Sequence, residues 1–228
     1  MDLQQFYSEC QKIDARLKQI RQESEFQDTD NRKWVFGVLR SQMIHYEIML
    51  HILHARYNQT IQPPDAFQEI IGIGYTEQAQ WEEFQVTAKI AYITLSHFVI
   101  ENFFKTLLAE LETSKDPPTG FYVITKTLLD KITISDKQRK LEVLNAMAMV
   151  RNSMHNNGIH APIPPAPPSQ TVTIGATTLN FDKGEEGSIL ESEMVDLINA
   201  VIDILDEIVQ APEIQNLTSV PLLFIPKF

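Results

Sequence analysis

The sequence predicts an all-α protein, an antiparallel helical bundle with one small β-hairpin inserted before its last helix. Three observations support this prediction. Apolar residues recur at helical spacing in several long segments, prolines and glycines separate those segments, and the stretch QTVTIGATTLNF is rich in β-branched residues. The chain has 228 residues, of which 43% are hydrophobic, so it can bury a substantial core. We expect one domain that spans residues 1–228.

The first predicted helix covers residues 3–22 within an N-terminal part of residues 1–30. Its apolar residues fall on one stripe with charged residues opposite, and the polar stretch ESEFQDTDN then supplies a turn. A second helix is predicted over residues 32–58 and opens a bundle core of residues 32–158. The two prolines of QPPD end any continuation and begin a loop. The apolar stripe of the first helix consists of Leu3, Phe6, Cys10, Ile13, Leu17 and Ile20.

The rest of the bundle core contains three further predicted helices. The longest covers residues 76–113 and stops at KDPPTG, and a shorter one covers residues 121–132. Ser135 and Asp136 then begin a helix that carries the run LEVLNAMAMV, and Gly158 is its expected stop. The apolar stripe of the longest helix consists of Ile90, Ile93, Ile100, Phe104, Leu107 and Leu111.

A proline-rich loop and a hairpin are predicted over residues 159–187. The stretch APIPPAPP, at residues 161–168, cannot be helical. In QTVTIGATTLNF two short β-rich runs flank a Gly-Ala pair, which predicts the hairpin. The last helix is predicted over residues 188–210, and the apolar tail of residues 211–228 is expected to pack on the body or on a partner. The apolar residues of the last helix are Leu190, Met194, Leu197, Ile198, Val201, Leu205 and Ile208.

Charge is distributed unevenly along the chain. The net charge is −11 at pH 7, so no global positive field attracts nucleic acid or an anionic membrane. Only residues 116–157 are net positive, with six Lys and Arg against four Asp and Glu. A phosphate-binding site is therefore expected in that segment rather than elsewhere.

The single cysteine, Cys10, excludes an intramolecular disulfide and the usual multi-cysteine zinc sites. The stretch MDLQQFYSEC shows no signal-peptide pattern, and no segment has the apolar length that a membrane-spanning helix needs. We expect a cytoplasmic protein that does not enter a membrane.

The segment RNSMHNNGIH, at residues 151–160, directly follows the run LEVLNAMAMV. At 100° per residue, Arg151 and His155 lie on one arc of about 80° with three apolar residues of the same helix. The pair therefore continues the buried face to the point where it becomes polar. The three apolar residues are Leu141, Leu144 and Ala148.

A guanidinium near a buried face needs a carboxylate or other hydrogen-bond acceptors close to it, because arginine cannot lose its charge. On the longest helix Glu101 lies beside the apolar stripe, so we predict that Glu101 faces Arg151. A purely structural interpretation also stays open, since Arg, His and Asn at a helix C-terminus favour its partial negative charge and bond its last carbonyls.

An Arg-Asn pair followed shortly by His, near the end of a late helix in a bundle, resembles the HEPN superfamily. The order of parts is also similar: some bacterial members have this motif, then an irregular stretch, a hairpin and a last helix. The stretch IENFFKTLLAEL resembles the HEPN helix that carries an inward acidic residue. The likeness covers residues 32–210 by architecture, whereas the motif itself is a few residues long.

The resemblance implies a metal-independent endoribonuclease of toxin or defence type, or an RNA-binding relative. Two protomers would pair so that both motifs line one cleft, and a partner protein would neutralise the activity. Arg151 would bind the scissile phosphate, His155 would act as general acid and base, and Asn152 would orient the pair. Glu101 and Asn156 are the expected supporting residues.

The motif departs from the family pattern in one respect. Three residues separate Arg151 from His155, where the family has four to six. The two residues still share a helix face, so two classes of function stay open. One is an RNA-cleaving enzyme, and the other is a catalytically silent module that binds RNA, a nucleotide or a partner protein.

No cofactor and no metal are expected. His51 and His54 lie in a His-x-x-His order, whereas di-metal bundles need Glu-x-x-His pairs from two helices. His97 and Glu101 are four apart and do not match that pattern either. These histidines are expected to be core or surface residues.

Overall fold

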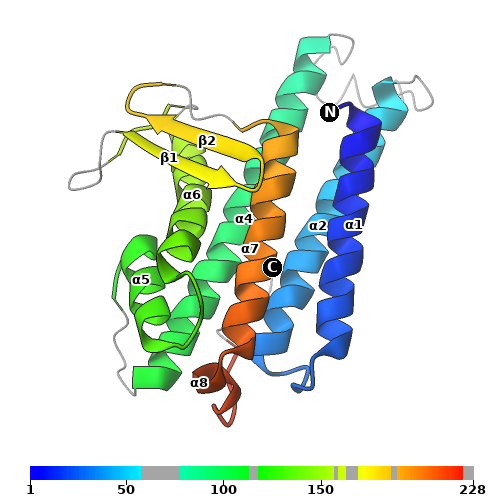
Figure 1. The fold of residues 1–228 in the computed structure, drawn as a ribbon. Helices are drawn as coiled ribbons and strands as arrows, with labels where there is room; N and C mark the ends of the chain where they lie inside the picture. The colour runs from blue at the N-terminus through cyan, green and yellow to red at the C-terminus, as the bar shows by residue number, and fades with distance from the viewer. Residues whose placement is uncertain (58–77, 113–117, 157–158, 163–168, 186–188, 223–228) are drawn as a thin grey trace.

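The computed structural model describes residues 1–57, 78–112, 118–156, 159–162, 169–185 and 189–222. Long helices run side by side in this part of the chain, and a two-stranded hairpin lies at one end of them (Figure 1). The predicted all-α bundle with an inserted hairpin is confirmed. The elements are, in chain order, α1 (Leu3–Glu23), α2 (Asn31–Tyr57), α4 (Gln78–Glu112), α5 (Phe121–Lys131), α6 (Lys137–His155), β1 (Ser169–Ile174), β2 (Thr177–Asp182), α7 (Glu191–Gln210) and α8 (Pro212–Gln215).

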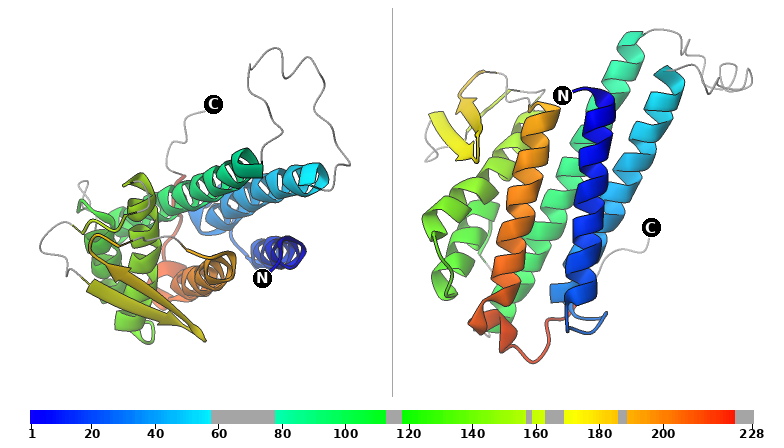
Figure 2. Two further views of the ribbon diagram at one scale, coloured as in Figure 1. Left: turned by 90° about the horizontal axis from the view of Figure 1, so that it is seen from above. Right: turned by 45° about the vertical axis from the view of Figure 1, so that its right-hand side comes forward.

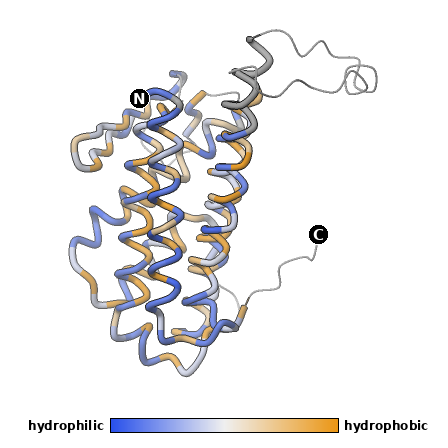
Figure 3. The backbone as a smooth tube through the Cα atoms, turned by 90° about the vertical axis from the view of Figure 1, so that its right-hand side faces the viewer, coloured by the Kyte–Doolittle hydropathy of each residue, from blue (hydrophilic) through white to orange (hydrophobic). Residues whose placement is uncertain are grey.

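The bundle is antiparallel, because α2 and α6 run opposite in direction to α1, α4 and α7 (Figure 1). Seen from above, α4 lies between α2 on one side and α5 and α6 on the other (Figure 2). The helices α1 and α7 lie along one side of the row that these four helices form (Figure 2). Apolar and polar residues are interspersed along the helices (Figure 3). The helix α4 is therefore in a position to connect the two halves of the bundle.

The predicted helices are present, and their described ends differ from the predicted ones by at most about three residues. The prediction for the tail was incomplete, since the short helix α8 begins at Pro212, where a proline suits the first turn. Several predictions lie outside the described residues: the loop of residues 58–77, the end of the longest helix at 113–117, the stop at Gly158, the proline-rich residues 163–168 and the last residues 223–228.

Cys10 lies in the core between α1 and its neighbours, as its place on the apolar stripe predicts. The residue is 0% exposed. Burial, with the charges of Glu47 and Glu9, raises the pKa of the thiol to about 12. The thiol therefore stays protonated near neutral pH and is no candidate nucleophile.

The hairpin pairs β1 with β2 in antiparallel register, with Ile174 opposite Thr177. Gly175 has φ +58°, a conformation that suits glycine in a tight hairpin turn. The buried residues of both strands alternate with exposed ones, so one face of the hairpin packs on the ends of α6 and α7 (Figure 1). The buried residues are Val172, Ile174, Leu179 and Phe181.

A buried ion pair at the other end of the bundle was not predicted from the sequence. Arg32 is 2% exposed, and its guanidinium donates to both carboxylate oxygens of Asp30 at 2.9 and 2.6 Å. The same guanidinium donates to the carbonyls of Ile214 and Leu217 at 2.8 and 3.0 Å. It also lies 3.8 Å from the centroid of the Phe26 ring. Arg32 thus joins the turn between α1 and α2 to the segment that follows α7.

The chain after α8 is bonded to the same turn. Val220 is fully buried, donates its N–H to Asp30 and accepts a bond from the N–H of Asn31. As far as Val220, the tail therefore packs on the body, which is one of the two predicted outcomes.

The ionisation of Asp30 follows from these contacts. Burial alone would raise the pKa of this carboxyl, but hydrogen bonds from the Arg32 side chain and from the N–H groups of Arg32 and Val220 lower it below its usual value. A pKa lowered by folding means that the unfolded chain binds the proton more readily. The contribution of Asp30 to stability is therefore present above its ordinary pKa and is lost as the pH falls through the lowered value.

Arg32→Met should destabilise the protein strongly, because it leaves the Asp30 carboxylate buried without its partner. We expect the free energy of unfolding, measured in urea, to fall by about 3–5 kcal/mol. Lys33→Met is the matched control, since Lys33 pairs at 3.4 Å with Asp28 on the surface and should change stability by at most about 1 kcal/mol. Equal losses in both variants would show that the buried pair is not special.

Candidate functional site

The candidate site lies at the C-terminal end of α6, on the segment that the sequence analysis singled out. Ser153 is buried and donates its hydroxyl to the carbonyl of Met149 at 2.9 Å, which fixes the inner side of the last turn. Asn156 donates its backbone N–H to the carbonyls of Asn152 and Ser153, and its side-chain amide to the carbonyl of Asn152 at 3.0 Å. Asn156 therefore caps the helix end, which is the structural role left open above.

Arg151 lies at the edge of the buried face, in agreement with its helical projection. Its side chain is partly buried, and its Nη1 donates to the Oδ1 of Asn152 at 2.9 Å. The Nε atom is buried and has no hydrogen-bond partner among the described residues. Within the same part of the chain, no carboxylate forms an ion pair with Arg151. Among the described residues, the guanidinium thus has an N–H group without an acceptor and a charge without a carboxylate partner.

The predicted contact between Glu101 and Arg151 is wrong. Glu101 instead accepts a bond from Lys105 at 2.6 Å and lies 3.8 Å from the Nδ1 of His97. All three residues belong to α4, at spacings of four, so the carboxylate finds its cation one turn away on its own helix. The projection correctly placed Glu101 beside the apolar stripe but did not consider this local partner.

Phe98 was missed by the sequence analysis and is the aromatic neighbour of Arg151. The Cζ of Arg151 lies 5.2 Å from the centroid of the Phe98 ring, and Phe98 is 44% exposed. The sequence signal for Phe98 is an aromatic residue on the polar side of the predicted helix. At 100° per residue Phe98 lies about 160° from Ile100, on the side of α4 away from the core.

His155 is the last residue of α6. Its side chain lies outside what the structure describes, so the geometry of the Arg151–His155 pair is untested. Of the predicted site residues, the structure joins Arg151 to Asn152 and Asn156 to the helix end. Glu101 instead pairs with Lys105 on α4.

Two other histidines, His97 and His160, occupy structural positions. His97 is 2% exposed, and its ring packs on Phe121 with centroids 4.4 Å apart. His160 lies beyond α6, where it is buried against Phe181 and exchanges backbone bonds with Gly184 and Glu185. Burial lowers the pKa of His160, so its buried imidazole is held neutral more firmly.

No group of three or more His, Cys, Asp or Glu among the described residues could hold a metal ion. No helix in the same part of the chain is long and apolar enough to cross a membrane.

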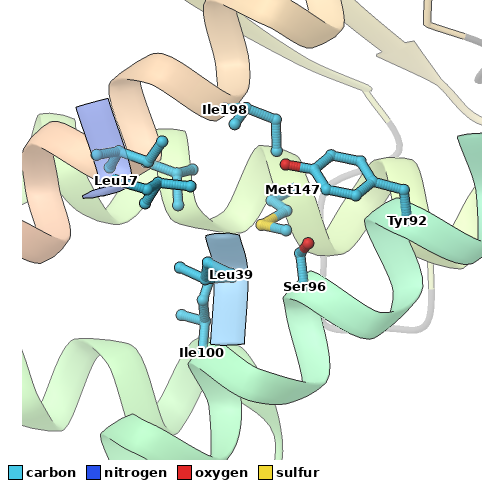
Figure 4. A pocket seen from close by; sticks show the side chains of 9 residues that line it. Leu17, Leu39, Tyr92, Ser96, Ile100, Met147 and Ile198 are labelled. Atoms are coloured by element: carbon cyan, nitrogen blue, oxygen red, sulfur yellow. The ribbon is translucent and has the colours of Figure 1, made fainter. Parts of the chain in front are cut away.

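A small cavity lies in the centre of the bundle, where α4 meets α1, α2, α6 and α7 (Figure 4). Its volume is about 10 Å³, the space of a single water molecule, which is too small for a substrate. Two hydroxyls, those of Tyr92 and Ser96, reach it from α4. The remaining lining is apolar: Leu17, Leu39, Ile100, Met147, Ile198, Val201 and Ile202.

Comparison of the chain with protein-family models, with curated proteins and with solved structures finds no match. Membership of the HEPN superfamily therefore stays a prediction. It depends on the motif RNSMHNN and on the order of the elements.

Arg151→Ala should have little effect on stability, because among the described residues Arg151 makes a hydrogen bond to Asn152 and a contact with an exposed ring. We expect the free energy of unfolding to fall by at most about 1 kcal/mol. Arg139→Ala, on the exposed side of the same helix, is the control. A loss of several kcal/mol for Arg151→Ala alone would make this residue part of the framework and weaken its candidacy as a binding group.

Proposed function

We propose that this protein is a HEPN-like, metal-independent endoribonuclease that binds RNA at the end of α6. The observation that carries the proposal is the Arg151 guanidinium, which is partly exposed, bonded to Asn152 and without a carboxylate partner among the described residues. A planar fork of N–H donors matches the oxygens of a phosphate. Arg151 would therefore bind the scissile phosphate and stabilise the charge that develops on it.

Asn152 supports this role through its bond to Arg151. Its Oδ1 accepts from Nη1 and so holds the guanidinium on the exposed side of the helix end. Replacing the amide by a carboxylate would neutralise the cation, whereas an amide orients it and leaves its charge available. This is the orienting role that the resemblance implies for the residue.

His155 supplies the proton transfer in this proposal. An imidazole titrates near neutral pH and would take the proton from a ribose 2′-hydroxyl. The 2′-oxygen then bonds to phosphorus, the bond from phosphorus to the 5′-oxygen breaks, and the imidazolium returns its proton to that leaving oxygen. The products are a 2′,3′-cyclic phosphate end and a 5′-hydroxyl end, and no metal is required.

A catalytically silent module is the second candidate, favoured by one observation about the motif. Only three residues separate Arg151 from His155. Phosphate and base must be placed within fractions of an ångström for catalysis, whereas binding tolerates a looser arrangement. In that case the same helix end would bind RNA, a nucleotide or a partner protein without cleavage.

We further propose that the protein acts as a homodimer and that a partner protein neutralises it, as in a toxin or defence system of the cytoplasm. The dimer follows from the resemblance to the HEPN superfamily. One Arg151 offers little attraction for an RNA strand, whereas a second copy would bring a second Arg151 to the same cleft and so raise the local positive charge there.

Cleavage of mixed cellular RNA by the purified protein in EDTA tests the enzymatic proposal. Arg151→Ala and His155→Ala should each lower the rate by at least about 100-fold, because each removes a group that acts on the reacting atoms. Asn152→Ala should lower activity more than stability, while Arg139→Ala should retain full activity. End-group analysis should find 2′,3′-cyclic phosphates. Absence of cleavage by well-folded wild type would leave the silent module.

Mixing the two inactive variants tests the shared cleft. After subunit exchange, about half of the dimers in an equal mixture contain one Arg151→Ala copy and one His155→Ala copy. We expect those dimers to recover RNA cleavage, since one cleft then holds an Arg151 and a His155 from different copies. Light scattering reports the mass in the same samples. A cleaving monomer, or a dimer without recovery, would contradict the shared cleft.

A further inference from the structure

We propose that Phe98 is a stacking surface for an unpaired base of the RNA strand whose phosphate binds at Arg151. This inference rests on the proposed function and names the class of its substrate: a single strand rather than a duplex. It assigns a binding role to a residue of α4 that the motif on α6 does not include.

The first observation is the exposure of the ring. Phe98 is 44% exposed on a helix whose core-facing residues, such as Ile93 and Ile100, are almost completely buried. An exposed aromatic ring offers a π-face to a ligand at little cost in side-chain entropy, because only two torsions must be fixed. Single exposed apolar residues are common, however, so exposure alone would not indicate a site.

The second observation is the guanidinium that lies over one face of the ring. The Cζ of Arg151 lies 5.2 Å from the ring centroid, so a cation for the phosphate and a surface for the base come from two different helices to one place. A nucleotide presents these two features, an anionic phosphate and a flat base, close together. Proteins that bind single strands combine positive charge along the backbone with aromatic rings that stack the bases.

The third observation concerns Asn152. Its Oδ1 accepts the bond from Arg151, while its Nδ2 makes no hydrogen bond to any described residue, and the side chain is exposed. These amide N–H groups can donate to a base edge or to a ribose oxygen beside the ring. Cation, ring and amide together fit one nucleotide with its base unstacked.

The class of strand follows from this arrangement. In duplex RNA the faces of the bases are covered by their neighbours, so a ring on a protein surface cannot stack on them without unpairing the helix. A single-stranded loop or end exposes its bases freely. Phe98 should therefore discriminate between a strand with bases and one without.

Binding measurements with uncleavable strands test this inference. The probes are a single-stranded 2′-O-methyl oligonucleotide that contains 2-aminopurine, the same oligonucleotide with abasic positions, and a duplex of equal length. We expect the wild type to bind the base-containing strand about 10-fold or more tightly than the abasic strand, with quenching of the 2-aminopurine fluorescence. The duplex should bind no better than the abasic strand.

Three variants separate stacking from other effects of the side chain. Phe98→Leu keeps an apolar side chain but has no π-face, so it should lose the preference for bases while its affinity for the abasic strand is unchanged. Phe98→Trp should retain the preference. Leu95→Ala, a change at an exposed apolar residue one turn away on α4, is the matched control and should behave as the wild type.

Arg151→Ala makes the failure of this inference distinguishable from the failure of the proposed function. It should weaken the binding of base-containing and abasic strands equally and reduce the salt dependence of binding. If Arg151→Ala binds both strands as the wild type does, the proposed function fails. If it loses binding but Phe98→Leu keeps the preference for bases, only the stacking role is overturned.

The same samples test the competing use of this surface as a contact between protein chains. Light scattering on Phe98→Leu and Leu95→Ala should give the wild-type mass. A reduced mass in both variants, with the preference for bases intact, would overturn the stacking role and assign the surface to self-association.

Discussion

The charge of a buried guanidinium is the constraint that holds the segment after α7 against the turn between α1 and α2. Arginine cannot deprotonate, so a chain that buries it must surround it with acceptors. At Arg32 the acceptors are the carboxylate of Asp30 and the carbonyls of Ile214 and Leu217. Since Asp30 precedes α2 and the two carbonyls follow α7, satisfying one cation fixes the turn between α1 and α2 to the segment after α7, at one end of the bundle. At Arg151 the same constraint is met only in part, and that difference separates a structural arginine from a candidate for binding.

The helices and the hairpin could be predicted because each depends on local patterns. The stripe of α1, the Gly-Ala turn of the hairpin and the apolar run of α6 need only neighbours along the chain. The pairing of Arg32 with the tail could not be predicted, because its partners lie about 180 residues away and two of them are backbone carbonyls, which every residue has. The error at Glu101 has a different cause: a long-range partner was preferred to Lys105, which a spacing of four places on the same face.

The end of α6 combines structural and chemical roles on adjacent residues. Asn156 and Ser153 bond backbone carbonyls, as polar residues near a helix end commonly do. Arg151 instead donates a hydrogen bond to the side chain of Asn152 and lies over the Phe98 ring on α4. The motif therefore does not act as one unit. The projection of α6 found the position of Arg151, while the importance of Phe98 depends on how α4 and α6 lie beside each other, which a single-helix projection does not contain.

The burial of Cys10 gives this chain an intrinsic reporter of its own opening. It is the single thiol of the sequence, it is inaccessible within the core, and a pKa near 12 leaves almost no thiolate to react. A maleimide reagent can therefore label the folded protein only when α1 moves away from its neighbours. The labelling rate measures the frequency of that opening without any engineered probe, and it would show how tightly the first helix is held while the helix end at Arg151 binds its ligand.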